Sequence, residues 1–174
     1  FLADVKGDLA GMSQAASAPG DKLKARIDAI GIADWSPQAN PVVFWDLYGK
    51  KGHPVRSTIS EMGPTLLGRL LERNYTHEGV MQIAVKVADD NGLLQLDLAD
   101  LRAMLAHVSA NAKEISAKYG LVSPQSVGAI QRGLLKLEQD GAGDFYAEPA
   151  LDLADFMRQD MNGRGVINIL SAEN

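Results

Sequence analysis

The chain has 174 residues, of which 46% are hydrophobic and 22% are charged, and its formal net charge is −5 at pH 7. This composition is typical of a globular domain, and the negative charge argues against a globally basic surface for nucleic acid. The absence of cysteine excludes disulfides, thiolate catalysis and sulfur-ligated metals. The absence of cysteine fits a reducing cytoplasm, where we expect the protein to be located. Since no apolar run is long enough to cross a membrane, we expect no membrane partner.

Apolar runs predict strands at both ends of the chain. Phe1–Val5 predicts a buried strand that is followed at once by charge and glycine. A second strand is predicted over Pro41–Leu47, and a last one over Val166–Leu170. Residues 55–59 predict either a short strand or an extended lead into a helix. A chain that opens and closes on such strands is typical of a piece of a larger domain.

Residues between the strands carry helical signals. Asp21 is expected to cap a helix that ends at Gly31, after a loop over 11–20. From Glu61 onward apolar residues recur at steps of three and four, and the longest stripe predicts one helix over 98–119.

Cap residues are expected to begin the later helices, which short loops would pack antiparallel. The caps are Thr76, within the triplet Asn74-Tyr75-Thr76, then Asp97, then Ser123 before Pro124, and Asp152 for a short helix over 151–157.

These elements predict an α/β fold with a large helical insertion. Its parts would be an α/β segment over 1–60, with strands over 1–5 and 41–47, a helical insertion over 61–160, and a return strand within 161–174. A free-standing α+β domain, mostly helical, would give the same pattern.

A search for self-sufficient catalytic motifs finds none in the sequence. The patterns G-x-x-x-x-G-K-[ST], G-x-G-x-x-G and H-E-x-x-H are all absent, and we predict no metal site. What remains is Asp4, Lys6 and Asp8 around Gly7, at the end of the first strand. These residues could meet a phosphate or a magnesium-bound water, although a surface turn with a local ion pair explains them as well.

The most basic spot of the sequence comprises Lys50, Lys51 and Arg56. It could contact nucleic acid, but it lacks the interleaved aromatic residues that stack on bases.

Several phrases of the sequence together resemble one family. They are Asp4–Leu9, Pro41–Gly49, Gly52–Arg56, Ser60–Pro64, Asp100–Leu105, Val127–Arg132, Glu148–Leu151 and Gly163–Leu170. The chain resembles the bacterial HerA-like helicases or ATPases, which are similar to RecA-like P-loop ATPases such as FtsK and the conjugative coupling proteins.

The resemblance implies a partial RecA-like sheet interrupted by a helical insertion. The family's phosphate-binding loop would precede Phe1–Val5, and its Walker B strand would follow Val166–Leu170. The intact protein would use ATP and Mg²⁺, act on DNA and assemble into a ring, expected to be a hexamer. The chain alone would be catalytically inactive and would bind no cofactor. It would be monomeric or paired through its terminal strands.

Few functional residues carry over from the family. Asp4, Lys6 and Asp8 match its motif and would lie near the nucleotide. Arg132 and Arg164 match family positions, and either could be an arginine finger, with pairing to acidic residues as the alternative. Glu148 before Pro149 also matches. A competing hypothesis is a stand-alone α+β interaction module, without enzymatic activity, that docks a partner through its helices.

Overall fold

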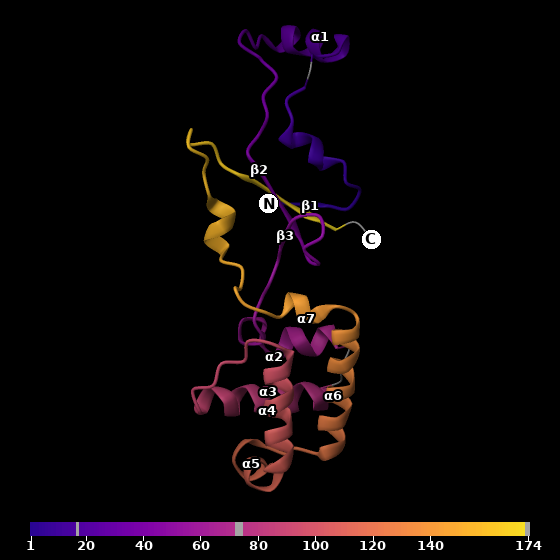
Figure 1. Ribbon diagram of the computed structural model, residues 1–174, viewed down its shortest axis with the longest axis vertical. Helices are drawn as coiled ribbons and strands as arrows, with labels where there is room; N and C mark the ends of the chain where they lie inside the picture. Colours follow the sequence, from indigo (N-terminus) through magenta and orange to yellow (C-terminus); the bar gives the residue numbers. More distant parts are fainter. Residues whose placement is uncertain (17, 72–74, 173–174) are drawn as a thin grey trace. The chain divides into compact units, whose positions relative to one another are not determined.

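The structure is a computed structural model that describes residues 1–16, 18–71 and 75–172. The chain divides into two compact units (Figure 1). The first comprises Phe1–Pro54 and Asp152–Asn174, and the second comprises Val55–Leu151. Each unit is described by itself below.

The first unit is built on a parallel sheet. Its strands are β1 (Leu2–Asp4), β2 (Val42–Asp46), β3 (His53–Pro54) and β4 (Ile167–Ser171). They are arranged in the order β1-β4-β2-β3, and all three pairings are parallel. The sheet and the helices together confirm the predicted mixed α/β class. The third strand lies at His53–Pro54, just before the stretch predicted to form either a strand or a lead into a helix.

The Trp45 indole and Asn168 on one face of the sheet contact the segment that contains Phe156. Trp45 Nε1 donates a 2.8 Å hydrogen bond to Asn168 Oδ1, and the Asn168 amide donates a 3.0 Å bond to the carbonyl of Phe156. The Trp45 ring meets the Phe156 ring edge-on, with 5.3 Å between centroids. These contacts fasten the 3₁₀ helix η2 (Leu153–Met157) to the sheet. The helix predicted over 151–157 is therefore a 3₁₀ turn, begun by Asp152 as expected.

The segment between β1 and β2 contains two helical elements. The 3₁₀ helix η1 (Leu9–Ser13) occupies part of the predicted loop over 11–20, and α1 spans Asp21–Ile30. Asp21 is the first residue of α1 and not its cap, because Gly20 holds the extended capping conformation. Gly31 ends the helix as predicted, in the left-handed region with φ +72°.

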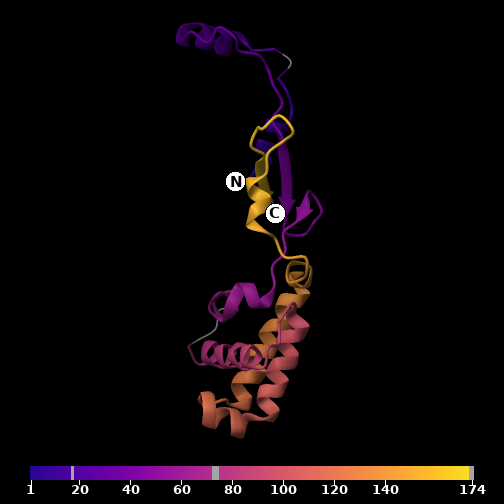
Figure 2. The same ribbon diagram turned by 90° about the vertical axis from the view of Figure 1, so that its left-hand side faces the viewer.

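The second unit is helical and has its own apolar core. Its helices are α2 (Ile59–Leu70), α3 (Tyr75–Asp90), α4 (Leu98–Ala110), α5 (Ala112–Tyr119), α6 (Pro124–Gln139) and α7 (Ala142–Phe145). Figures 1 and 2 show α4 and α6 side by side, with α3 running across them instead of lying antiparallel. Completely buried residues of the core include Ile59, Met81, Leu101, Leu105, Ile130 and Leu134.

Side-chain caps begin most of the long helices. Thr58 and Glu61 form a reciprocal capping box at α2. Asp97 and Ser123 cap α4 and α6 as predicted, and Pro124 is the first residue of α6. Thr76 is not a cap, because α3 already includes Tyr75. The other residue of that predicted start, Asn74, lies outside the described residues.

Two helices are interrupted by single residues. Gly63, at φ +72°, breaks α2, and Pro64 restarts it. The helix predicted over 98–119 breaks at Asn111, whose side-chain amide donates a 2.9 Å bond to the carbonyl of His107. An asparagine side chain that bonds a nearby carbonyl offers the backbone an alternative to the helix, and it divides the predicted helix into α4 and α5.

Two adjacent leucines on α6 test the described core. Leu134 is completely buried, whereas Leu135 is 48% exposed. We expect Leu134→Ala to lower the free energy of unfolding of the helical unit by about 2–5 kcal/mol, because it leaves a cavity. Leu135→Ala is the matched control, with an expected loss below about 0.5 kcal/mol. Urea denaturation followed by far-ultraviolet circular dichroism measures both, and equal losses would contradict the described orientation of α6.

Candidate functional site

Three neighbouring strands end at the same level on one edge of the sheet. The register places Asp4 of β1 and Asp46 of β2 on either side of Ser171 of β4. Since the strands are parallel, this edge is formed by their carboxyl ends, where open α/β sheets bind ligands. Side chains alternate between faces along a strand, so all three residues lie on the same face.

Asp4 anchors the loop that follows β1. Its carboxylate is 5% exposed and accepts backbone N–H bonds from Lys6 at 3.3 Å, Gly7 at 2.8 Å and Leu9 at 3.1 Å. Gly7 has φ +75°, a conformation that glycine adopts without strain. The carboxylate therefore shapes the loop from inside.

Asp46 does the same for the loop that follows β2. Its side chain is 7% exposed, and Oδ1 accepts a 3.0 Å bond from the N–H of Tyr48. Its Oδ2 accepts bonds of 2.9 Å and 2.7 Å from the N–H groups of Lys50 and Lys51. The bonds from the loop amides, first those of Tyr48 and Lys51, hold the pKa of Asp46 below its ordinary value, because they stabilise the charged form.

The loop after β2 also requires a glycine for close approach. A Cβ atom at Gly52 would lie 2.5 Å from the carbonyl oxygen of Phe44, so a larger residue would push the loop away from the strand. The loop is thus fixed both by the buried carboxylate and by backbone contact.

The side chains that the two loops leave in solvent carry mostly positive charge. Lys6, Lys50 and Lys51 are exposed cations, and Asp8 is an exposed carboxylate. The ammonium of Lys6 has no partner among the residues that the structure describes. Lys50 lies 5.6 Å from the centroid of the Tyr48 ring. Since Asp4 and Asp46 are already bonded by amides, the exposed charge of the two loops at this edge is mostly positive.

The predicted residues are only partly brought together. Asp4, Lys6 and Asp8 lie at the carboxyl edge of the sheet. Arg164 precedes β4, at the opposite edge. Its Nε donates a 2.9 Å bond to Asp160 Oδ2, and its Nη1 donates a 3.1 Å bond to the carbonyl of Ala39.

Arg132 belongs to the second unit. It is exposed on α6 and lines a depression of about 490 Å³ together with Arg102, Gly128, Gln131 and Leu135. Arg102 pairs with Glu138 at 3.0 Å, whereas Arg132 forms no ion pair within the described part of the chain.

The basic spot predicted from the sequence is divided between the units. Lys50 and Lys51 belong to the first unit, and Arg56 belongs to the second. Arg56 Nη1 donates a 3.1 Å bond to the carbonyl of Glu148, which precedes Pro149 through a cis peptide bond.

Sequence reasoning missed Asp46 and its loop as part of the site. The available signal was the same as for Asp4, namely an aspartate that ends an apolar strand and is followed by glycine and lysine. Over residues 1–16, 18–71 and 75–172, side chains that could ligate a metal do not gather in groups of three. In that same part of the chain, every helix is too short or too polar to cross a membrane.

The first unit is thus an α/β structure with lysine-bearing loops at the carboxyl edge of a parallel sheet, the edge at which open α/β sheets bind ligands. The family model for the helicase HerA-like C-terminal region matches residues 1–174, and the chain belongs to this family. This confirms the resemblance found in the sequence. Searches among curated proteins and among solved structures gave no match.

Removing the Asp46 carboxylate tests its anchoring role. At pH 7 we expect Asp46→Ala to lower the free energy of unfolding by about 1–3 kcal/mol, because three partly buried amide bonds of the loop lose their acceptor. The folded-state pKa lies below the ordinary value of 3.8, so this contribution is present above that value and is lost as the pH falls through the folded-state pKa.

Urea titrations followed by tryptophan fluorescence at pH 7 and below pH 4 measure this effect. Asp8→Ala removes an exposed carboxylate from the neighbouring loop and serves as the control. An Asp46→Ala deficit that stayed constant down to the lowest pH would contradict the anchoring role.

Proposed function

We propose that this chain is the part of a HerA-like ATPase that places cationic loops beside a nucleotide, in a cytoplasmic enzyme that moves or unwinds DNA. One observation carries the proposal. In a chain of this family, two buried aspartates fix two lysine-bearing loops at the carboxyl edge of a parallel sheet.

The loops fit phosphate better than they fit a metal. Lys6 presents an ammonium without a partner among the described residues, and ammonium groups recognise phosphate oxygens. The carboxylate oxygens of Asp4 and Asp46 accept hydrogen bonds from backbone amides, so these residues do not by themselves form a Mg²⁺ site. ATP supplies the phosphoanhydride whose hydrolysis drives the motor. The role of Lys6 is to hold negative charge, and that of Asp4 is to hold the loop.

The sequence lacks a G-x-x-x-x-G-K-[ST] loop, so we propose that the triphosphate is cradled by another segment of the intact ATPase. We propose that Mg²⁺ is likewise bound outside these residues. On this view the 174-residue chain shows no sustained ATP turnover on its own.

Assembly into a ring, with a hexamer as the proposed state, is supported by the surface of the first unit. β1 lies at the edge of the sheet. Phe1 and Val5, which flank β1 in the sequence, have exposed apolar side chains. Leu153 and Met157 of η2 are exposed as well. Exposed edges and apolar patches are typical of surfaces that meet other protein segments.

Of the two arginine-finger candidates, Arg132 is the better one. Arg164 is held by Asp160 and by the carbonyl of Ala39, whereas Arg132 is exposed. A finger must be able to reach the nucleotide of a neighbouring subunit.

Charge removal at Lys6 tests the nucleotide-proximal role. In a HerA-like protein that contains this sequence and a phosphate-binding loop, we expect Lys6→Ala to lower kcat/KM for ATP by about tenfold or more, the value of one charge-assisted hydrogen bond. Lys22→Ala removes an exposed charge from α1 and is the matched control. A steady-state ATPase assay with DNA present measures both, and equal activities would remove Lys6 from the site.

Arg132 is tested by complementation between subunits. We expect Arg132→Ala to lower kcat by about 10³-fold or more if the guanidinium acts as a finger. Mixing it with subunits that lack the phosphate-loop lysine should restore part of the turnover, because each supplies what the other lacks. Arg69→Ala, an exposed arginine of α2, is the control. A small loss, or mixtures that stay inactive, would favour a structural role for Arg132.

A further inference from the structure

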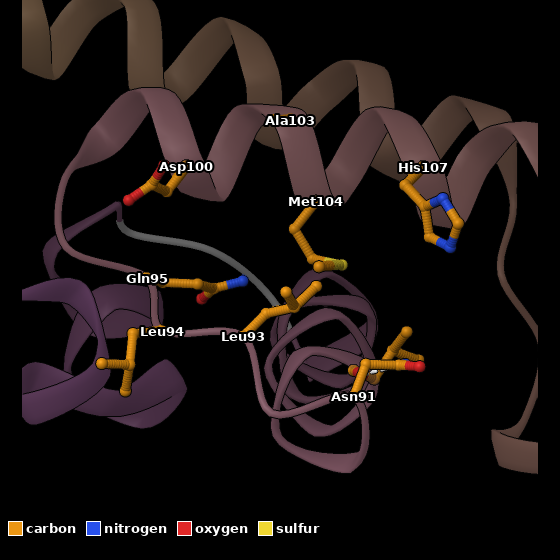
Figure 3. Close-up of a pocket in the computed structure, with 9 residues that line it drawn as sticks. Asn91, Leu93, Leu94, Gln95, Asp100, Ala103, Met104 and His107 are labelled. Atoms are coloured by element: carbon orange, nitrogen blue, oxygen red, sulfur yellow. Dashed lines mark hydrogen bonds between the residues drawn. The ribbon is translucent and has the colours of Figure 1, made fainter.

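The helical unit contains a groove that the proposed ATPase function does not use. It has a volume of about 580 Å³, within the range of ~300–1,000 Å³ typical of ligand sites. The end of α3, the loop over 91–97 and the first turns of α4 form it (Figure 3). Its lining comprises Val87, Asn91, Leu93, Leu94, Gln95, Asp100, Ala103, Met104 and His107.

Gln95 is a buried polar group without a side-chain partner. It is 2% exposed, and its backbone is fixed because its N–H and its carbonyl both bond to Ser60, at 3.0 Å and 2.9 Å. Neither Nε2 nor Oε1 of its amide has a hydrogen-bond partner in the described structure. In Figure 3 the amide extends from the loop toward Leu93 and Met104. A buried amide in this state lowers stability unless a ligand bonds it.

The rim of the groove is apolar and exposed. Leu93 is 51% exposed and Leu94 is 75% exposed. These two leucines are adjacent and follow Gly92 in a loop. Met104 is 8% exposed and supplies a flexible, polarisable floor. Exposed leucines beside an open groove are typical of contacts with another protein chain, whereas small-molecule sites enclose most of their ligand.

The electrostatics of the groove favour a cation. Asp100 lies at the same end as Gln95, and only its Oδ2 accepts a described bond, from the N–H of Leu96 at 2.9 Å. From Val87 to His107 the sequence carries four aspartates and one arginine, of which Asp100 lines the groove and Asp90 pairs with Lys86 at 2.7 Å. That arginine, Arg102, already pairs with Glu138.

We propose that this groove binds an extended segment of a partner protein in which a bulky aliphatic side chain stands next to lysine or arginine. The N–H and C=O of one extended residue would bond the Gln95 amide, which offers both a donor and an acceptor. The aliphatic side chain would lie against Leu93 and Met104. The basic side chain would pair with Asp100. This binding is independent of ATP and of the phosphate-contacting role proposed for Lys6.

A peptide array tests the proposed chemistry. The full 174-residue chain is applied to immobilised short peptides with leucine fixed at the centre and every other position scanned. We expect lysine and arginine to be enriched beside the leucine, and aspartate and glutamate to be depleted. The best peptide is then measured in solution by fluorescence anisotropy. An array without this charge preference, or a peptide that fails to saturate, would overturn the proposal.

Two variants locate the binding. Gln95→Met keeps the length of the side chain and removes both amide atoms, and Asp100→Asn removes the charge and keeps the shape. We expect each to weaken binding of the selected peptide by about tenfold. Gln125→Met and Glu114→Gln, at exposed positions of α6 and α5, are the matched controls and should bind as the unmodified chain does.

A stability readout separates ligand binding from a structural role. Because the Gln95 amide has no partner, Gln95→Met should unfold at the same or a higher temperature than the unmodified chain. A lower unfolding temperature would assign the amide a structural role and overturn the proposal. Self-association of the chain in ultracentrifugation that Gln95→Met and Leu94→Ala abolish would overturn it as well, in favour of a second copy as the occupant.

Discussion

Two buried carboxylates determine the carboxyl edge of the sheet. Asp4 and Asp46 are nearly inaccessible, and each accepts three bonds from the amides of the loop that follows its strand. Burial removes water from a carboxylate, and at each site three amide donors replace the hydrogen bonds that water would have made. The carboxylates therefore fix the conformation of the loops, and the exposed lysines of the loops determine the charge at this edge.

The two units differ in how much of their apolar surface they bury. The helical unit buries a continuous core that includes Ile59, Leu105 and Ile130, and its long helices mostly begin with side-chain caps. In the first unit, the buried apolar residues among those described are Ile27 and Ile169, while Phe1 is 65% exposed and Met157 76% exposed. Burial of so little apolar surface contributes little hydrophobic free energy to the stability of this unit.

Much of the fold could be predicted because it depends on local chemistry. Asp97, Ser123 and Asp152 each bond an amide two or three residues ahead, so the short pattern alone identifies a helix start. The break at Asn111 was missed because apolar residues keep their helical spacing on both sides of it. This spacing gives no sign of the bond from the Asn111 side chain to the carbonyl of His107. The packing of η2 was missed for a different reason, since Phe156 contacts Trp45, which lies far away in the sequence.

The site shows the same division between local and distant causes. Asp4, Lys6 and Asp8 could be found from a strand end, and Asp46 could have been found by the same rule. Gln95 could not, because its burial depends on Ser60, thirty-five positions away, and on Met104 across the groove.

Comparing Asp46 with Gln95 shows what burial of a polar group implies. Both are nearly inaccessible, but Asp46 has three donors, whereas the Gln95 amide has no partner among the described residues. A satisfied buried group needs no ligand to account for it. An unsatisfied amide carries a free-energy penalty of about 1–3 kcal/mol that a binding partner can remove. Tyr146 is also buried with an unpaired hydroxyl, but it lies in the core and does not line the groove beside Gln95. It is the combination of an unpaired amide, an open groove with an apolar rim and a nearby carboxylate, Asp100, that distinguishes Gln95 as a recognition residue.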